Sequence, residues 1–238
     1  MCEILIKVNC PHCQSSKVVK NGKKKNGGQN LLCRNCGKQF LEQYQKKGAD
    51  PAVKRFIIRL LERNSGVRDI EALLGISRKC ILDNLCRQGN AIEIKPGQKH
   101  YTSVQIDEVW SYVGKKKKGK YWLLYAYSPQ TDEILAYACG SSSAKTVKQL
   151  LKKLKAVEVD EYCTDHWKAF TKVLPAGKHK IGKEYTKNIE GVNTCIRARN
   201  RRFIRKTTGF SKKKENHEAA LNIMFNYRNK HKTKHHTF

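Results

Sequence analysis

Acidic residues are scarce in this sequence, where 20 Asp and Glu stand against 49 Lys and Arg and the formal net charge is +29. So large a positive excess favours a polyanionic partner, and the phosphate backbone of a nucleic acid is the commonest one. A basic surface that serves only solubility is the alternative interpretation.

Long apolar runs are also missing. None approaches the ~18 residues that span a bilayer, and the first residues, MCEILIKVNCPHC, lack the apolar region and cleavage site of a signal peptide. We therefore expect no membrane partner and a cytoplasmic location. In that reducing compartment, the paired cysteines among the 10 present are better interpreted as metal ligands than as disulfides.

Two CxxC pairs, CPHC and CRNC, supply four thiolates: Cys10, Cys13, Cys33 and Cys36. Each pair lets two thiolates reach one ion from a tight turn, and four thiolates complete a tetrahedral Zn²⁺ site. Such a closed site predicts a structural zinc and a zinc-ribbon DNA-binding module over residues 1–45. Four unrelated thiols or a redox CxxC are the alternatives, and Cys2 is a conceivable substitute ligand.

Residues 50–88 are predicted to form a helix-turn-helix that binds DNA. Asp50 and Pro51 are typical of a helix start, and Gly75 marks the turn before a second helix. The first turn of that second helix would lie nearest to the bases, and it contains Ser77, Arg78 and Lys79. Three small helices that pack only against one another are the alternative.

Residues 89–100 carry Gly and Pro and are predicted to be a linker. After them, TSVQIDEVWSYVG, KYWLLYAYS and EILAYACG have the β-branched and aromatic content of strands. A helix, SAKTVKQLLKKLKA, a strand, VEVDEYCTD, and mostly helix to about Asn229 follow. This order predicts an α/β fold over residues 101–230, a mixed sheet with flanking helices whose last strand is parallel to the first. Residues 231–238 are predicted to be a basic tail.

Three of the few carboxylates have distinctive positions. Asp107 lies in the middle of the first strand, Asp165 at the end of the fourth, and Glu190 in a strongly basic helix, YTKNIEGVNTCIRARNRR. Adjacent parallel strands would place the two aspartates side by side, and a helix packed across them would add the glutamate. Such carboxylates repel one another unless divalent cations such as Mg²⁺ or Mn²⁺ neutralise them. Glu108 would replace Asp107 if the strand register differed by one residue.

The stretches QIDEVWSYVG, TDHW and YTKNIEGVNTCIRARNR, followed by FSKKKENH, resemble the insertion sequence one family of DDE transposases. The resemblance covers nearly the whole chain and implies a zinc finger, a helix-turn-helix and an RNase H-like catalytic domain. It also implies that Asp107, Asp165 and Glu190 hold two catalytic Mg²⁺ or Mn²⁺ ions. Arg197, two turns beyond Glu190, would contact a DNA phosphate.

The function implied is that of a prokaryotic, nucleoid-associated transposase. It would bind the terminal inverted repeats of an insertion sequence and catalyse metal-dependent 3′-end cleavage and strand transfer. Its partners would be double-stranded DNA, from both the element and the target, and further copies of itself in a homodimer or larger assembly. A DNA-binding regulator with an idle metal site and an RNase H-like nuclease are the alternatives.

Overall fold

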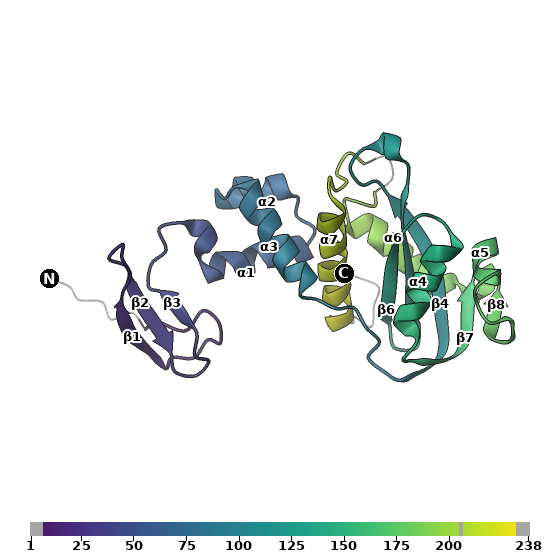
Figure 1. Ribbon diagram of the computed structural model, residues 1–238, viewed down its shortest axis with the longest axis horizontal. Helices are drawn as coiled ribbons and strands as arrows, with labels where there is room; N and C mark the ends of the chain where they lie inside the picture. The colour runs from purple at the N-terminus through teal and green to yellow at the C-terminus, as the bar shows by residue number, and fades with distance from the viewer. Residues whose placement is uncertain (1–6, 205–206, 232–238) are drawn as a thin grey trace.

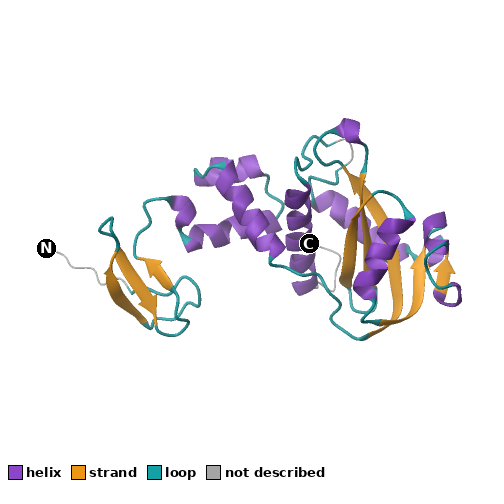
Figure 2. Cartoon of the chain, in the orientation of Figure 1, coloured by secondary structure: helices purple, strands orange, loops and turns teal. Residues whose placement is uncertain are grey.

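The computed structural model describes residues 7–204 and 207–231. In chain order, this part of the molecule consists of a small sheet, a group of three helices and a larger sheet with helices on both faces (Figures 1 and 2). Cys2 and all but the first residue of the predicted tail at 231–238 lie outside the described residues. Within those residues, no helix has the length and apolarity needed to cross a membrane.

The N-terminal sheet is antiparallel and has a very small core. Its strands, in the order in which they pair, are β1 (Val18–Lys23), β2 (Gln29–Cys33) and β3 (Gln39–Leu41). Its buried core consists of Cys10, Leu31, Cys33 and Phe40. A core of this size does not offset the conformational entropy lost on folding, so this module needs a further cross-link.

Capping residues set the limits of the helices that follow. These are α1 (Pro51–Glu62), α2 (Val67–Leu74) and α3 (Arg78–Asn90). The Asp50 carboxylate accepts a hydrogen bond of 2.7 Å from the Ala52 amide and so begins α1. Gly75 ends α2 with a φ of 62°, a left-handed conformation that glycine adopts without steric cost. Four buried isoleucines hold the helices together: Ile57, Ile70, Ile76 and Ile81.

The second half of α3 packs against the C-terminal helix, α7 (Lys214–Lys230). Leu85 of α3 is buried with Ala219, Ala220 and Ile223 of α7. The two helices approach so closely at Gly89 that a Cβ atom there would lie 2.4 Å from the carbonyl oxygen of Ala219. The helical module therefore shares a core with the larger α/β part (Figure 1).

The larger sheet has five strands in the order β6-β5-β4-β7-β8. They are β4 (His100–Ser111), β5 (Tyr121–Ser128), β6 (Glu133–Gly140), β7 (Glu158–Thr164) and β8 (His179–Ile181). Central strand β4 is antiparallel to β5 and parallel to β7, which confirms the predicted parallel pairing. The middle of β4 thus lies beside the carboxyl end of β7.

Helices cover both faces of this sheet, so the predicted mixed α/β fold is confirmed. On one face, α4 (Ala144–Leu154) and α5 (Lys168–Thr171) pack on a core that includes Val104 and Ile106. On the other, α6 (Lys187–Arg199) and α7 pack on a core that includes Val109 and Tyr125 (Figure 1). The chain from Asp165 to Asn229 is mostly helix, as predicted, although it also contains the short strand β8, which the prediction did not include.

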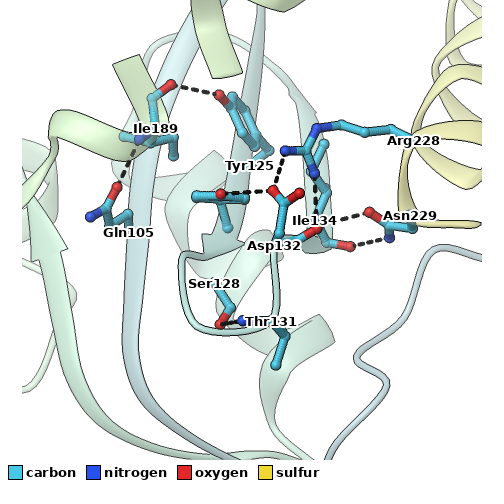
Figure 3. A network of polar contacts seen from close by, with 10 residues as sticks. Gln105, Tyr125, Ser128, Thr131, Asp132, Ile134, Ile189, Arg228 and Asn229 are labelled. Atoms are coloured by element: carbon cyan, nitrogen blue, oxygen red, sulfur yellow. Dashed lines mark hydrogen bonds and ion pairs between the residues drawn. The ribbon is translucent and has the colours of Figure 1, made fainter. Parts of the chain in front are cut away.

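The end of α7 is fastened to the turn between β5 and β6 (Figure 3). The Arg228 guanidinium forms an ion pair of 2.5 Å with Asp132, which also accepts a hydrogen bond of 2.8 Å from the Tyr127 hydroxyl. The Asn229 side chain bonds to both the amide and the carbonyl of Ile134, at 2.9 and 2.8 Å. These bonds fix α7 against the sheet.

Candidate functional site

Three carboxylates meet where β4 and β7 lie side by side. Asp107 and Glu108 are neighbours on β4, and Asp165 directly follows Thr164, the last residue of β7. The register pairs Gln105 with Cys163, so two residues further along, Asp107 and Asp165 come level. One oxygen from each of the three carboxylates lies within 4.8 Å of the others.

The two carboxyl groups on β4 are partly removed from water, which makes their charged forms less favourable. Burial raises the pKa of Asp107 to about 6. Burial, together with the charges of Asp107 and Asp165, raises the pKa of Glu108 to about 8. The Oε2 atom of Glu108 is buried, with no hydrogen-bond partner among the described residues. A buried, unpaired carboxylate oxygen beside two further acids fits a divalent cation, which is bound through oxygen ligands of this type.

Hydrogen bonds from two strands position α6 beside Asp107. The Gln105 side chain accepts a bond of 2.8 Å from the Ile189 amide, and the Tyr125 hydroxyl donates to the Ile189 carbonyl at 3.3 Å (Figure 3). The Tyr125 hydroxyl also lies 2.8 Å from Oδ1 of Asn193, whose amide nitrogen donates to the Asp107 carboxylate. Asn193 was not among the predicted site residues; its position three residues after Glu190, on the same helix face, was the available signal.

Glu190 and Arg197, the two charged site residues predicted on α6, differ in their burial. Arg197 is half-buried, and its charge is among the influences that lower the pKa of Asp107. Glu190 is exposed in the first turn of α6 and does not belong to the described group of three carboxylates. Glu190, Asn193 and Arg197 follow one face of the helix, and Asn193 is the residue that contacts Asp107.

A second site with the chemistry of a metal centre lies in the N-terminal sheet. One sulfur from each of four cysteines, Cys10, Cys13, Cys33 and Cys36, lies within 4.8 Å of the others. The Cys10–Cys36 and Cys13–Cys33 sulfur distances are 3.7 and 3.5 Å. Tetrahedral zinc with Zn–S bonds of ~2.3 Å requires sulfurs ~3.8 Å apart. The residues therefore fit a structural Zn²⁺, which all four thiolates would hold.

The three residues predicted to contact DNA lie at the exposed start of α3. The Ser77 hydroxyl accepts a hydrogen bond of 3.3 Å from the Cys80 amide and caps the helix. Arg78 forms an ion pair of 3.1 Å with Glu71. Lys79 is exposed beside them. The second half of α3 contacts α7 on one side, whereas its first turn is exposed to a partner.

The chain matches models of two known families. The model described as IS1 transposase matches residues 101–233, and the model described as InsA N-terminal domain, a zinc ribbon, matches residues 5–37. The first match contains the carboxylate cluster and the second contains all four cysteines. Both matches thus cover the parts of the chain that carry the two sites.

Individual relatives agree with this assignment. The chain is 37% identical over 117 residues to the insertion element iso-IS1n protein InsB of Shigella dysenteriae, covering 49% of this chain and 88% of that protein. It is 32% identical over 145 residues to the insertion element IS1 9 protein InsB of Escherichia coli strain K12, covering 61% and 86%.

One solved structure, a simian T-cell lymphotropic virus intasome in complex with PP2A regulatory subunit B56 gamma, gives a TM-score of 0.35 at 12% identity, covering 71% of this chain and 65% of that one. That score is too low to establish a common fold. The family match does not depend on it, since the IS1 transposase model covers more than half of the residues. The chain belongs to the IS1 family of DDE transposases, enzymes that bind and cut DNA with the help of divalent metal ions.

Proposed function

We propose that this protein binds the terminal inverted repeats of an insertion sequence and catalyses 3′-end cleavage followed by strand transfer. The observation that carries the proposal is the meeting of Asp107, Glu108 and Asp165 within the part of the chain that matches the family model. Two divalent ions, Mg²⁺ or Mn²⁺, would supply activation of the attacking oxygen and stabilisation of the leaving oxygen.

The residues around the cluster have separate roles in this proposal. Asp107 and Asp165 would hold the ions, and the hydrogen bond from Asn193 would keep the Asp107 carboxylate in one orientation. Arg197, on the same face of α6, would bind a phosphate of the DNA through its planar guanidinium. Its half-buried position beside Asp107 supports this role.

The third acidic ligand has two candidates. Glu190 lies one helical turn before Asn193 on the same face, and bringing its exposed side chain to the cluster would cost on the order of 2 kcal/mol or less in rotamer entropy. Glu108 is already in the cluster and has an oxygen without a partner. We propose that Glu190 completes the site when DNA is bound, with Glu108 as the alternative ligand.

DNA binding would involve the whole length of the chain. We propose a zinc ribbon over 1–45, a helix-turn-helix over 50–88, a linker over 89–100 and a catalytic domain over 101–230. Ser77, Arg78 and Lys79 would face the bases, and the net charge of +29 would hold the phosphates. Transposition joins two ends of an element, so a homodimer or a larger assembly is the expected active form.

A strand-transfer assay with Mg²⁺ tests this function. We expect joined products from the parent protein and none from Asp165→Asn, which should still bind DNA. Glu161→Gln is the matched control, because Glu161 is also an acid of β7 but pairs with Lys180 at 2.7 Å, outside the cluster. Binding without product in the parent would identify a regulator. Cleavage of hybrids or junctions with no preference for element ends would identify an RNase H-like nuclease.

The same assay separates the two candidates for the third ligand. If Glu190 completes the site, Glu190→Gln abolishes strand transfer and Glu108→Gln reduces it less. The reverse order would assign the position to Glu108.

A further inference from the structure

Beside the carboxylates, aromatic side chains gather with lysines at the end of the β4–β5 hairpin. We call this group the aromatic patch: Trp110, Tyr112, Trp122 and Phe210. The Trp110 and Tyr112 ring centroids are 5.5 Å apart, and those of Tyr112 and Phe210 are 5.9 Å apart. Trp110 and Trp122 are cross-strand partners. All four side chains remain partly exposed to solvent.

Exposed lysines lie over these rings. The Lys120 ammonium is 4.7 Å from the Trp110 ring centroid and 5.7 Å from that of Trp122. Lys116 lies 5.9 Å from the Tyr112 ring, and Lys212 lies 4.4 Å from the Phe210 ring. These ammonium groups end long, exposed stems, so they can leave the rings for a phosphate at little cost.

The patch adjoins the candidate site on two sides. Trp122 and Glu108 line the same narrow crevice, and Trp110 and Tyr112 line a small hollow together with Arg197. The two segments that build the patch, residues 109–131 and 191–214, contain no Asp or Glu. A strand of DNA that leaves the carboxylate cluster would therefore meet aromatic faces and positive charge with no nearby acid from these segments.

We propose that the aromatic patch binds unpaired nucleotides next to the phosphate on which the enzyme acts. Bases would stack on the rings, and Lys116, Lys120 and Lys212 would move to the phosphates. Aromatic faces combined with cations are the usual means of holding single-stranded DNA, because every base offers a face for stacking. The inference rests on the proposed function for the location of the reacting phosphate.

The test measures binding without turnover, in buffer without added Mg²⁺ or Mn²⁺ and without a chelator, so that the zinc site stays loaded. The probe is a mixed-sequence duplex of about 30 base pairs with about three unpaired adenines at one end, one of them replaced by 2-aminopurine. The full-length parent should bind it about tenfold more tightly than the fully paired duplex and should quench the 2-aminopurine. Placing the unpaired adenines on the 3′-ended or the 5′-ended strand shows which strand occupies the patch.

The double variant Tyr112→Leu with Phe210→Leu keeps apolar side chains but removes the stacking faces. We expect it to lose the preference for the unpaired end while binding the paired duplex like the parent. Tyr185→Leu is the matched control, because Tyr185 is 40% exposed and lies 5.8 Å from Lys180, but it precedes α6 and does not contribute to the patch.

Two results would overturn the proposal: no quenching by the parent, or the same loss of preference in Tyr185→Leu as in the double variant. The quenching measurement needs no substitution, so it decides the question even if a variant folds poorly. Strand transfer is measured separately. A parent that quenches but joins no ends would refute the proposed function alone, and a parent that joins ends without quenching would refute this inference alone.

Discussion

The close contact between α3 and α7 at Gly89 predicts that a larger residue there destabilises the protein. Gly89→Ala would place a Cβ atom 2.4 Å from the Ala219 carbonyl oxygen and 2.6 Å from the Ala219 Cα, both backbone atoms. Contact between non-bonded carbon atoms is favourable near 3.5–4.0 Å, so the helices would have to separate by about 1 Å. Gly191→Ala is the same substitution within α6, with nothing inside 4 Å of the added atom.

The magnitudes follow from these distances. Alanine is favoured over glycine inside a helix by about 1 kcal/mol, so Gly191→Ala should raise the free energy of unfolding by about that amount. At Gly89 the same gain is opposed by overpacking, which costs about 1–3 kcal/mol. Separating the helices would also weaken two interhelical hydrogen bonds of 2.9 Å, from Asn222 to the Gly89 carbonyl and from Cys86 to Asn216. Each of these bonds contributes about 1 kcal/mol. We expect Gly89→Ala to lower the free energy of unfolding by about 2 kcal/mol.

Urea denaturation of both variants and the parent measures this difference. Circular dichroism reports all the helices, whereas tryptophan fluorescence reports the larger α/β part, since the three tryptophans are at positions 110, 122 and 167. Both signals should shift to lower urea in Gly89→Ala if the helical module and the α/β part unfold together. If the unfolding transition of Gly89→Ala moved to higher urea, as that of Gly191→Ala is expected to do, the close contact of the helices would be refuted.

Three further predictions concern the two sites and the core. Cys33→Ser removes one of four thiolates, so the protein should release zinc to a chromophoric chelator; unchanged zinc content would contradict the site. Asn193→Ala removes a donor to Asp107 and should lower strand transfer about tenfold with DNA affinity unchanged, whereas Asn188→Ala, exposed on the same helix, should have no effect. Burial lowers the pKa of His217 to about 3 from its usual 6.5, so only the unfolded state takes up this proton between these values. Stability should therefore fall as the pH drops through that range, and His217→Phe should flatten the fall in urea titrations; an unchanged slope would disprove the assignment.

Most of the sheet could be predicted because its sequence pattern is strong. The strands that contain Asp107, Tyr125 and Tyr137 are long, rich in β-branched and aromatic residues, and separated by clear turns. Strand β8 has only three residues, His179–Ile181, too few for any periodicity, and it is a strand because it pairs with β7. Ser211, between α6 and α7, is likewise placed by a tertiary contact, its pairing with Val113.

The candidate site was predictable to the extent that strand adjacency determines it. Asp107 and Asp165 come level because β4 and β7 are parallel neighbours. Side chains alternate along a strand, so Glu108 was expected to point away from Asp107; the structure nonetheless brings an oxygen of each within 4.8 Å of Asp165. Asn193 could be placed only on the helix face of Glu190, since the pattern does not show which polar residue on that face will contact a particular carboxylate.

The arrangement of the helices connects the three-helix module to the carboxylates through well-packed contacts. The first turn of α3 is exposed, whereas Leu85 near its other end is buried against α7. The other end of α7 is fastened to the β5–β6 turn by Arg228 and Asn229, and β5 pairs directly with β4, which carries Asp107. Each step is a packed interface or a paired strand, so DNA held by α3 would lie at a fixed distance from the cluster. The position of cleavage relative to the bound sequence would then be determined by the fold.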